Sequence, residues 1–244
     1  MGDAMTEEER VRRARMIESK NKRIRQLRSR IILCAAIVLV LLLGIAVLIG
    51  KSKKAEKTVA EDVSVTDEKY IAERPELDVE LLPVNKYSRP GTALSEVNGI
   101  VIHYTANPGT TALQNREYFA GLAETGETSA SSHFIIGLEG EIVQCIPCNE
   151  IAYASNDRNA DTISIECCIE DESGRFNPDT YQSLVELTAW LMGQYDLDVD
   201  AVIRHYDVTG KNCPKYYVEH ESSWRAFKSN LIDYIDKNGQ EKSK

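Results

Sequence analysis

Residues 31–50 form an uncharged segment that constrains this chain more than any other feature. The segment reads IILCAAIVLVLLLGIAVLIG and has the length at which a helix crosses the hydrocarbon core of a bilayer. A cleaved signal peptide is the main alternative, but its apolar region is normally shorter and ends at an Ala-x-Ala site, which does not follow here. We therefore expect a single retained transmembrane helix.

Basic residues on the two sides of this segment predict its orientation. Six Lys/Arg lie in residues 20–30 and four in residues 51–57, and the whole segment 1–30 carries ten. Positive charge favours the cytoplasmic side of a membrane. We expect residues 1–30 to be a cytoplasmic basic tail, with the C-terminal part of the chain outside the cell membrane.

The chain beyond the apolar segment is acidic. Residues 58–244 hold fifteen Lys/Arg and thirty-two Asp/Glu, and the formal net charge of the whole chain is −9. A nucleic-acid partner is not expected, because phosphate binding needs a basic surface. Residues 51–80 are polar and charged without an apolar period, which predicts an extracytoplasmic linker.

Residues 81–238 have the pattern of one globular domain, followed by a short tail at 239–244. Apolar runs predict strands at 98–104, 132–138, 141–146, 161–169 and 202–205, and helical spacing predicts helices at 112–124, 178–195 and 222–236. Asn177 and Pro178 are typical of a helix start, and Glu139-Gly140 is typical of a hairpin turn. The alternation of strands and helices predicts an α/β domain with a mixed central β-sheet flanked by helices.

A histidine and a cysteine close together indicate a metal site. His205 and Cys213 lie eight residues apart after a short apolar run, and Gly210 and Pro214 predict a loop between and after them. Imidazole and thiolate are good zinc ligands, and a catalytic zinc usually has three protein ligands. The best third candidate is His103, at the end of the strand predicted at 98–104, although a core histidine bonded to a backbone carbonyl is the alternative for that residue alone.

Four motifs in order carry a family resemblance. They are Ile-Val-Ile-His-Tyr-Thr (100–105), Ser-His-Phe-Ile-Ile-Gly (132–137), Ser-Ile-Glu (164–166) and His205 followed by Lys-Asn-Cys-Pro (211–214). Over roughly residues 95–236 the chain resembles the zinc-dependent N-acetylmuramoyl-L-alanine amidases. This group includes bacteriophage lysozymes of the T7 type and the peptidoglycan recognition proteins.

The resemblance implies an activity and the residues that carry it. It implies a peptidoglycan hydrolase that cleaves the amide bond between N-acetylmuramic acid and L-alanine, with zinc on His103, His205 and Cys213. The apolar segment at 31–50 adds the expectation that this hydrolase is anchored in the membrane. Glu166 would be the general base, because apolar neighbours raise a carboxyl pKa toward the useful range. Lys211 would stabilise the oxyanion. The alternatives are a surface glutamate and a solvated loop lysine.

Further residues are candidates for contact with the substrate. We expect His133 to line the cleft, with a role as an alternative metal ligand as the other interpretation, and Asn156 and Arg158 to contact peptide or sugar. Ser132 stands where some relatives carry Tyr. A role that depends on the tyrosine hydroxyl is therefore not expected, and Glu166 has to carry more of the mechanism.

Four other cysteines leave their pairing open. Cys145 and Cys148 form a C-x-x-C motif. Three interpretations stay open for it: a redox pair, half of a metal site, or, in an oxidising space, a disulfide with Cys167 or Cys168. Cys167 and Cys168 are adjacent on a predicted strand, so their side chains should point to opposite faces.

Two other functions compete with hydrolysis by a zinc enzyme. The first is a peptidoglycan-binding recognition module without activity; recognition proteins of this kind typically lack the cysteine ligand, which this chain has. The second is a cysteine hydrolase with Cys213 as nucleophile. Pro214 follows directly and no helix start is expected at Cys213 to lower its pKa, which argues against that reaction.

Overall fold

The computed structural model describes residues 70–241 of this 244-residue chain. The predicted cytoplasmic tail 1–30, the predicted transmembrane helix 31–50 and most of the predicted linker lie outside the described residues. Within 70–241, no helix has the length and apolar character needed to cross a membrane.

A six-stranded mixed sheet forms the centre of the domain. The strand order is β2-β5-β4-β6-β3-β7. Only β4 and β5 run antiparallel, across the predicted hairpin; the other neighbours are parallel. The bounds are β2 Asp78–Val79, β3 Gly99–Tyr104, β4 Phe134–Ile136, β5 Ile142–Gln144, β6 Thr162–Cys167 and β7 Val202–Arg204. The mixed α/β sheet predicted from the apolar runs is confirmed.

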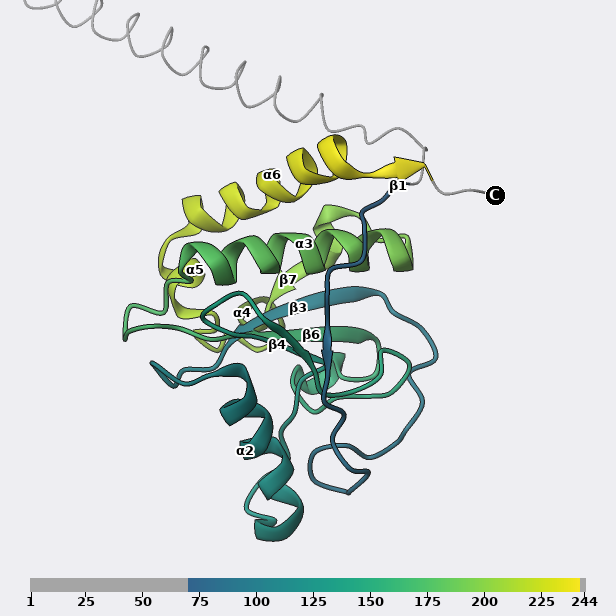
Figure 1. The fold of residues 1–244 in the computed structure, drawn as a ribbon, viewed down its shortest axis with the longest axis vertical. Helices are drawn as coiled ribbons and strands as arrows, with labels where there is room; N and C mark the ends of the chain where they lie inside the picture. Colours follow the sequence, from purple (N-terminus) through teal and green to yellow (C-terminus); the bar gives the residue numbers. More distant parts are fainter. Residues whose placement is uncertain (1–69, 242–244) are drawn as a thin grey trace, which may run out of the picture. The chain divides into compact units, whose positions relative to one another are not determined.

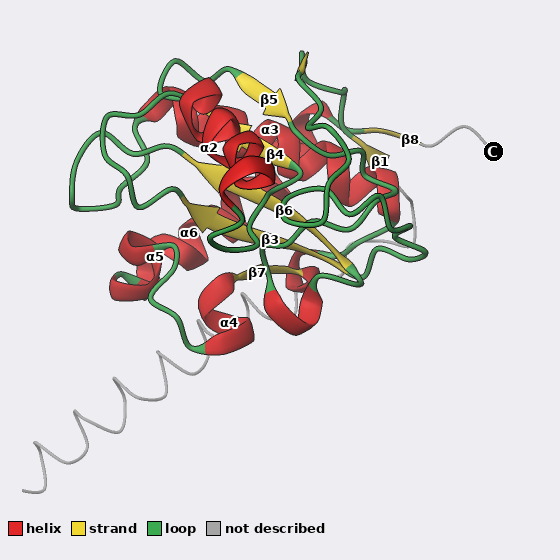
Figure 2. Cartoon of the chain, turned by 90° about the horizontal axis from the view of Figure 1, so that it is seen from below, coloured by secondary structure: helices red, strands yellow, loops and turns green. Residues whose placement is uncertain are grey.

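Helices cover both faces of the sheet (Figure 1). Helix α3 lies on one face with α6 outside it, and α2 lies on the other face. The longer helices are α2 Ala112–Thr125, α3 Pro178–Tyr195 and α6 Glu221–Asn238. Short helices α4 His205–Thr209 and α5 Lys215–Glu219 follow β7 (Figure 2), and two 3₁₀ turns are η1 Asn156–Arg158 and η2 Val199–Ala201.

Local signals set the ends of the long helices. The side chain of Asn177 accepts a hydrogen bond from the backbone of Thr180 at the start of α3, and Pro178 occupies the first turn. Helix α2 begins with a capping box in which Thr111 and Gln114 bond each other's backbone. It ends at Gly126, whose φ of 60° suits glycine.

Alternation along the strands divides the core into two layers. Ile100 and Ile102 of β3, with Ile163 and Ile165 of β6, pack in the cluster that includes α3 and α6 residues. The residues between them on β3 and β6 point to the opposite face. Ile135 of the neighbouring strand β4 lies on that face and packs in the cluster that includes α2. His103 and Glu166 have the parity of this second face, so the alternation keeps both out of the α3 layer.

The domain begins earlier than the sequence predicts. Strand β1, Tyr70–Ile71, pairs antiparallel with β8, Gln240–Glu241, and β2 pairs with β5. Residues 70–80, predicted to be linker, and 240–241, predicted to be tail, are therefore part of the folded domain. Two-residue strands carry no apolar period of their own, and their pairing depends on distant segments.

Candidate active site

Two neighbouring strands place His103 and Glu166 side by side. The two residues are direct partners in the parallel register of β3 and β6. Both lie near the carboxyl ends of their strands, the edge at which open α/β sheets bind ligands. The Nδ1 atom of His103 is 4.0 Å from Oε1 of Glu166.

An ion-pair network fixes His205 at the end of β7. His205 is the first residue of α4, not the last residue of a strand as predicted. The preceding Arg204 donates to both carboxylate oxygens of Asp207, and also to the backbone oxygen of Tyr217 and to Glu221. These bonds tie the first turn of α4 to the segments that follow it.

A backbone hydrogen bond returns Cys213 to the same place. The segment predicted to be a loop forms helix α4, which ends at Gly210, and the chain then turns back. The amide of Tyr206 donates to the carbonyl of Cys213 at 2.9 Å. As a result, His205 and Cys213, which are eight positions apart in the sequence, lie together beside His103.

His103, His205 and Cys213 form a buried cluster with the chemistry of a metal site. One ligand atom from each lies within 4.8 Å of the other two. The Sγ of Cys213 is 3.8 Å from Nδ1 of His103. The buried Nδ1 of His205 has no hydrogen-bond partner in the described part of the chain. A cation in this cluster would satisfy that nitrogen, so the three residues fit a bound metal ion.

Burial favours the neutral form of both imidazoles. Burial, then the neighbouring His205, then Lys211, lower the pKa of His103 well below its usual value. Burial and Lys211 also lower the pKa of His205. A metal ligand has to be unprotonated, so these shifts keep the rings ready to bind a cation.

The thiol of Cys213 is protonated unless a cation is present. Burial, together with the charge of Glu166, raises the pKa of this thiol to about 12. A bound cation would remove the proton from a coordinating thiol. Without a metal, Cys213 is a poor nucleophile, because the thiolate is the reactive form.

Glu166 has an unusual environment for a carboxylate. Its side chain is 18% exposed, and its Oε2 is buried with no hydrogen-bond partner among residues 70–241. Burial raises the pKa of Glu166 to about 8, and the positive charge of Lys211 opposes that rise. A carboxylate with so few partners can exchange protons with a molecule bound next to it. Lys211 itself is exposed, two residues before Cys213.

The structure does not favour a substrate contact for His133. Its ring is 1% exposed, Nε2 donates to the carbonyl of Glu150, and Nδ1 accepts from the backbone of Ser164. The ring is an internal hydrogen-bonding bridge and does not line a cleft. Ser132 is also fully buried, and its hydroxyl donates to the carbonyls of Phe134 and Ser164.

Asn156 and Arg158 lie in one turn but have different surroundings. The Oδ1 of Asn156 is 3.0 Å from Nε2 of His205, so this residue belongs to the site. Arg158 pairs with Asp161, and its guanidinium lies beside Gly99 at the start of β3. Gly99 precedes His103 by four residues, about 13 Å along a strand. The predicted substrate contact of Arg158 is therefore not supported by its position.

Ser155 is a site residue that the sequence analysis missed. Its buried hydroxyl is 3.2 Å from Nε2 of His103. Fifty-two positions separate the two residues, and no local pattern links a serine before a 3₁₀ turn to a histidine on a strand.

The five described cysteines are all free thiols. Cys167 packs in the cluster with α3, whereas Cys168 packs in the cluster with α2, which confirms the predicted opposite orientations. Burial raises the pKa of Cys145 to about 12 and that of Cys148 to about 11. These two thiols are therefore protonated at neutral pH and poorly reactive.

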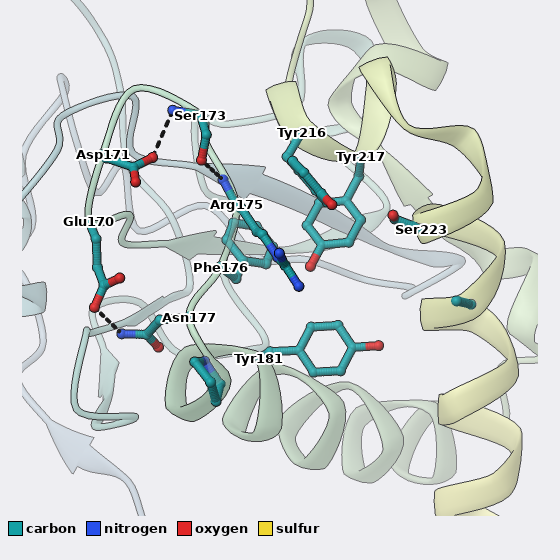
Figure 3. Close-up of a pocket in the computed structure, with 12 residues that line it drawn as sticks. Glu170, Asp171, Ser173, Arg175, Phe176, Asn177, Tyr181, Tyr216, Tyr217 and Ser223 are labelled. Atoms are coloured by element: carbon teal, nitrogen blue, oxygen red, sulfur yellow. Dashed lines mark hydrogen bonds between the residues drawn. The ribbon is translucent and has the colours of Figure 1, made fainter.

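A separate pocket of about 580 Å³ lies between the segment after β6, the start of α3, and helices α5 and α6 (Figure 3). Phe176, Tyr181, Tyr216 and Tyr217 contribute aromatic rings, and the guanidinium of Arg175 lies over the ring of Tyr216. Neither Glu166 nor any of the three residues of the metal cluster lines this pocket. It is distinct from the metal cluster.

Comparison with known proteins agrees with this geometry. The family model described as N-acetylmuramoyl-L-alanine amidase (Amidase_2) matches residues 93–216. The chain is 38% identical over 161 residues to N-acetylmuramoyl-L-alanine amidase CwlL of Bacillus licheniformis, covering 61% of this chain and 44% of the relative. It is 34% identical over 171 residues to N-acetylmuramoyl-L-alanine amidase BlyA of Bacillus subtilis, covering 62% and 45%.

A solved structure shows the same fold. The catalytic domain of XlyA superposes with a TM-score of 0.54 and 27% identity, and the match covers 64% of this chain and 99% of that domain. The chain spans about half the length of the curated relatives it matches. The family match covers half of this chain and includes His103, Glu166, His205 and Cys213. This chain belongs to the N-acetylmuramoyl-L-alanine amidase family Amidase_2.

Proposed function

We propose that this chain is a zinc-dependent N-acetylmuramoyl-L-alanine amidase that hydrolyses peptidoglycan and is anchored in the cell membrane by residues 31–50. The observation that carries the catalytic part is the cluster of His103, His205 and Cys213 with Glu166 beside it. Two imidazoles and one thiolate suit zinc better than magnesium or calcium, which prefer oxygen ligands. Three protein ligands leave a position for water or substrate.

Each residue has a distinct role in the proposed reaction. His103, His205 and Cys213 would hold the ion, which would act as a Lewis acid and would lower the pKa of a water molecule. Glu166 accepts a proton from the attacking water. It then returns that proton to the amide nitrogen as the bond to the muramic acid lactyl carbonyl breaks, giving a carboxylate and the free amine of L-alanine. Lys211 offers positive charge to the oxygen that becomes negative.

The substrate class follows from the family and fits the charge of the domain. The relatives are named for cleavage between N-acetylmuramic acid and L-alanine. Residues 58–244 are acidic, which does not favour nucleic acid as a partner of the domain. The raised pKa of the Cys213 thiol argues against the alternative of a cysteine hydrolase.

A digestion experiment tests the catalytic proposal. The full-length protein, in detergent because of its apolar segment, is incubated with purified peptidoglycan with and without a strong chelator. Mass spectrometry should find stem peptides with a free L-alanine amine, lost with chelator and restored by zinc. Binding to peptidoglycan without release of peptides, by protein that contains zinc, would identify a recognition module instead.

Membrane anchoring is tested separately. The full-length protein should sediment with membranes and resist extraction by salt or alkaline carbonate. A variant that lacks residues 1–50 should become extractable. External protease should degrade the C-terminal domain in spheroplasts while a tag at residue 1 stays protected. Recovery of the full-length protein in the aqueous fraction would contradict the anchor.

A further inference from the structure

The turn after Ala154 holds both metal-site histidines. The hydroxyl of Ser155 is 3.2 Å from Nε2 of His103, and Oδ1 of the next residue, Asn156, is 3.0 Å from Nε2 of His205. The rings of the two histidines are themselves in edge contact, with centroids 4.7 Å apart. One dipeptide therefore reaches two ligands that lie on different segments of the chain.

The backbone explains how adjacent side chains reach the same place. Consecutive residues of an extended strand point in opposite directions. Asn156 has a φ of 52°, in the left-handed region that asparagine tolerates better than most residues. This conformation interrupts the alternation and lets the side chains of Ser155 and Asn156 face the same cluster.

A second asparagine fixes the turn. The Oδ1 of Asn159 accepts hydrogen bonds from the backbone amides of Ala154 and Ser155, at 3.0 Å and 2.6 Å. The amide of Arg158 donates to the carbonyl of Ser155. The position of the dipeptide is thus set by its own turn and does not depend on a bound ion.

The contact with Asn156 selects which nitrogen of the His205 ring is free. An amide oxygen only accepts, so Nε2 of His205 has to carry the proton, and its Nδ1 keeps a lone pair. That Nδ1 is the buried atom without a partner. In His103, Nε2 faces the hydroxyl of Ser155, which can accept or donate a proton, and Nδ1 faces the Sγ of Cys213 at 3.8 Å.

We propose that Ser155 and Asn156 are positioning residues, which together fix the orientation of both metal-site histidines so that each presents Nδ1 to the ion, and that Asn156 also fixes the tautomer of His205. The inference rests on the proposed metal site. It assigns Asn156 a contact with His205, a proposed metal-coordinating residue, in place of the predicted contact with substrate. Outer partners of this kind typically change metal affinity by about 10- to 100-fold when removed.

The test is metal affinity, measured on the full-length protein without substrate. Asn156→Gly removes the acceptor but keeps the left-handed backbone accessible, and Asn156→Asp keeps an acceptor at the same place. Ala160→Gly is the matched control, because it adds a glycine to the same exposed loop without touching a histidine. Zinc affinity is obtained by competition with a coloured chelator, and cobalt-loaded protein gives an absorption spectrum that reports ligand geometry.

Asn156→Gly should bind zinc about 10- to 100-fold more weakly and alter the cobalt spectrum. Asn156→Asp and Ala160→Gly should stay within about threefold of the parent protein, and Ser155→Ala should weaken binding as Asn156→Gly does. Equal affinity in Asn156→Gly and the parent, or an equal loss in Asn156→Asp, would overturn the inference. If the parent protein digests peptidoglycan and Asn156→Gly and Ser155→Ala keep full zinc affinity, only this inference is refuted. Shifted affinities in a protein without hydrolysis refute only the proposed function.

Discussion

His103 and Glu166 are register partners on the parallel strands β3 and β6, with Nδ1 and Oε1 4.0 Å apart. The backbone pairing of two buried strands, and not a loop, sets the distance between a proposed ligand and the proposed base. Sites built on strands are held more tightly than sites on loops. This arrangement allows the roles of metal binding and proton transfer to be separated by mutation.

Glu166→Gln should abolish most activity without removing the metal. An amide of the same shape cannot accept a proton from water, so kcat should fall by about 10²- to 10⁴-fold. Metal content, measured by mass spectrometry of the purified protein, should match that of the parent. A variant that loses its metal would show that Glu166 is a ligand.

A chelator should abolish activity, whereas alkylation of cysteines should leave it unchanged. In the zinc enzyme, Cys213 is coordinated and buried, so iodoacetamide at neutral pH should leave peptidoglycan hydrolysis intact while a chelator removes it. The pKa of about 12 predicts slow alkylation of Cys213 even after metal removal. Mass spectrometry of the alkylated peptide checks this. Cys213→Ala should be purified without stoichiometric zinc.

Lys211→Met should change the pH dependence of activity as well as its size. The positive charge of Lys211 lowers the pKa of Glu166. Its removal should raise that pKa, so the rising, acidic limb of the profile of kcat/KM should move to higher pH. Loss of oxyanion stabilisation should lower kcat by up to about 100-fold at the optimum. Lys211→Arg keeps the charge and should keep the parent's acidic limb.

His133 should make the folded state sensitive to acid. Burial lowers the pKa of His133 from 6.5 to about 4. Between these values the unfolded chain binds the proton more readily, so the free energy of unfolding falls as pH decreases from about 6.5 toward 4, by about 3 kcal/mol in total. Above pH 6.5 this contribution is fully present.

His133→Gln isolates the acid effect. The variant should show a flatter dependence of unfolding free energy on pH than the parent over that range. Urea titrations of chelator-treated protein at several pH values make the measurement, and the other histidines are common to both proteins. Parallel curves would show that His133 does not couple folding to pH.

Local signals predicted the parts of the fold that have local causes. Helix α3 begins and ends at Pro178 and Tyr195 as expected, because its cap, its proline and its apolar spacing are all contained in the helix. The predicted strands are longer than the observed ones by a few residues, since apolar side chains continue beyond the last backbone pair. Cys168, for example, is fully buried just after β6 ends.

Elements that depend on distant partners were not predictable in this way. Gly210 and Pro214 indicated a loop, but the bonds of Arg204 to Asp207 and Glu221 stabilise helix α4 there. Residues 70–80 had the composition of a linker, but pairing with β8 and β5 and the burial of Ala72 in the core make them part of the domain.

The candidate site shows the same division. The meeting of His103, His205 and Cys213 in one cluster could be predicted from ligand chemistry and motif order. The contacts of Ser155 and Asn156 could not, because they require knowledge of which turn passes over which strand. His133 was misplaced for a related reason: a histidine in an apolar run has the same sequence pattern whether its ring is open to substrate or bonded internally.

The pairing of β1 with β8 brings Tyr70 and Glu241 together, so the folded unit has its entrance and its exit at one corner. A unit with adjacent ends can be attached to another polypeptide, or inserted into one, without opening its core. The same unit would also tolerate having its ends joined and new ends cut elsewhere. In genetic terms, adjacent ends allow the coding sequence of this domain to be joined to that of other proteins without interrupting the segments that form the site.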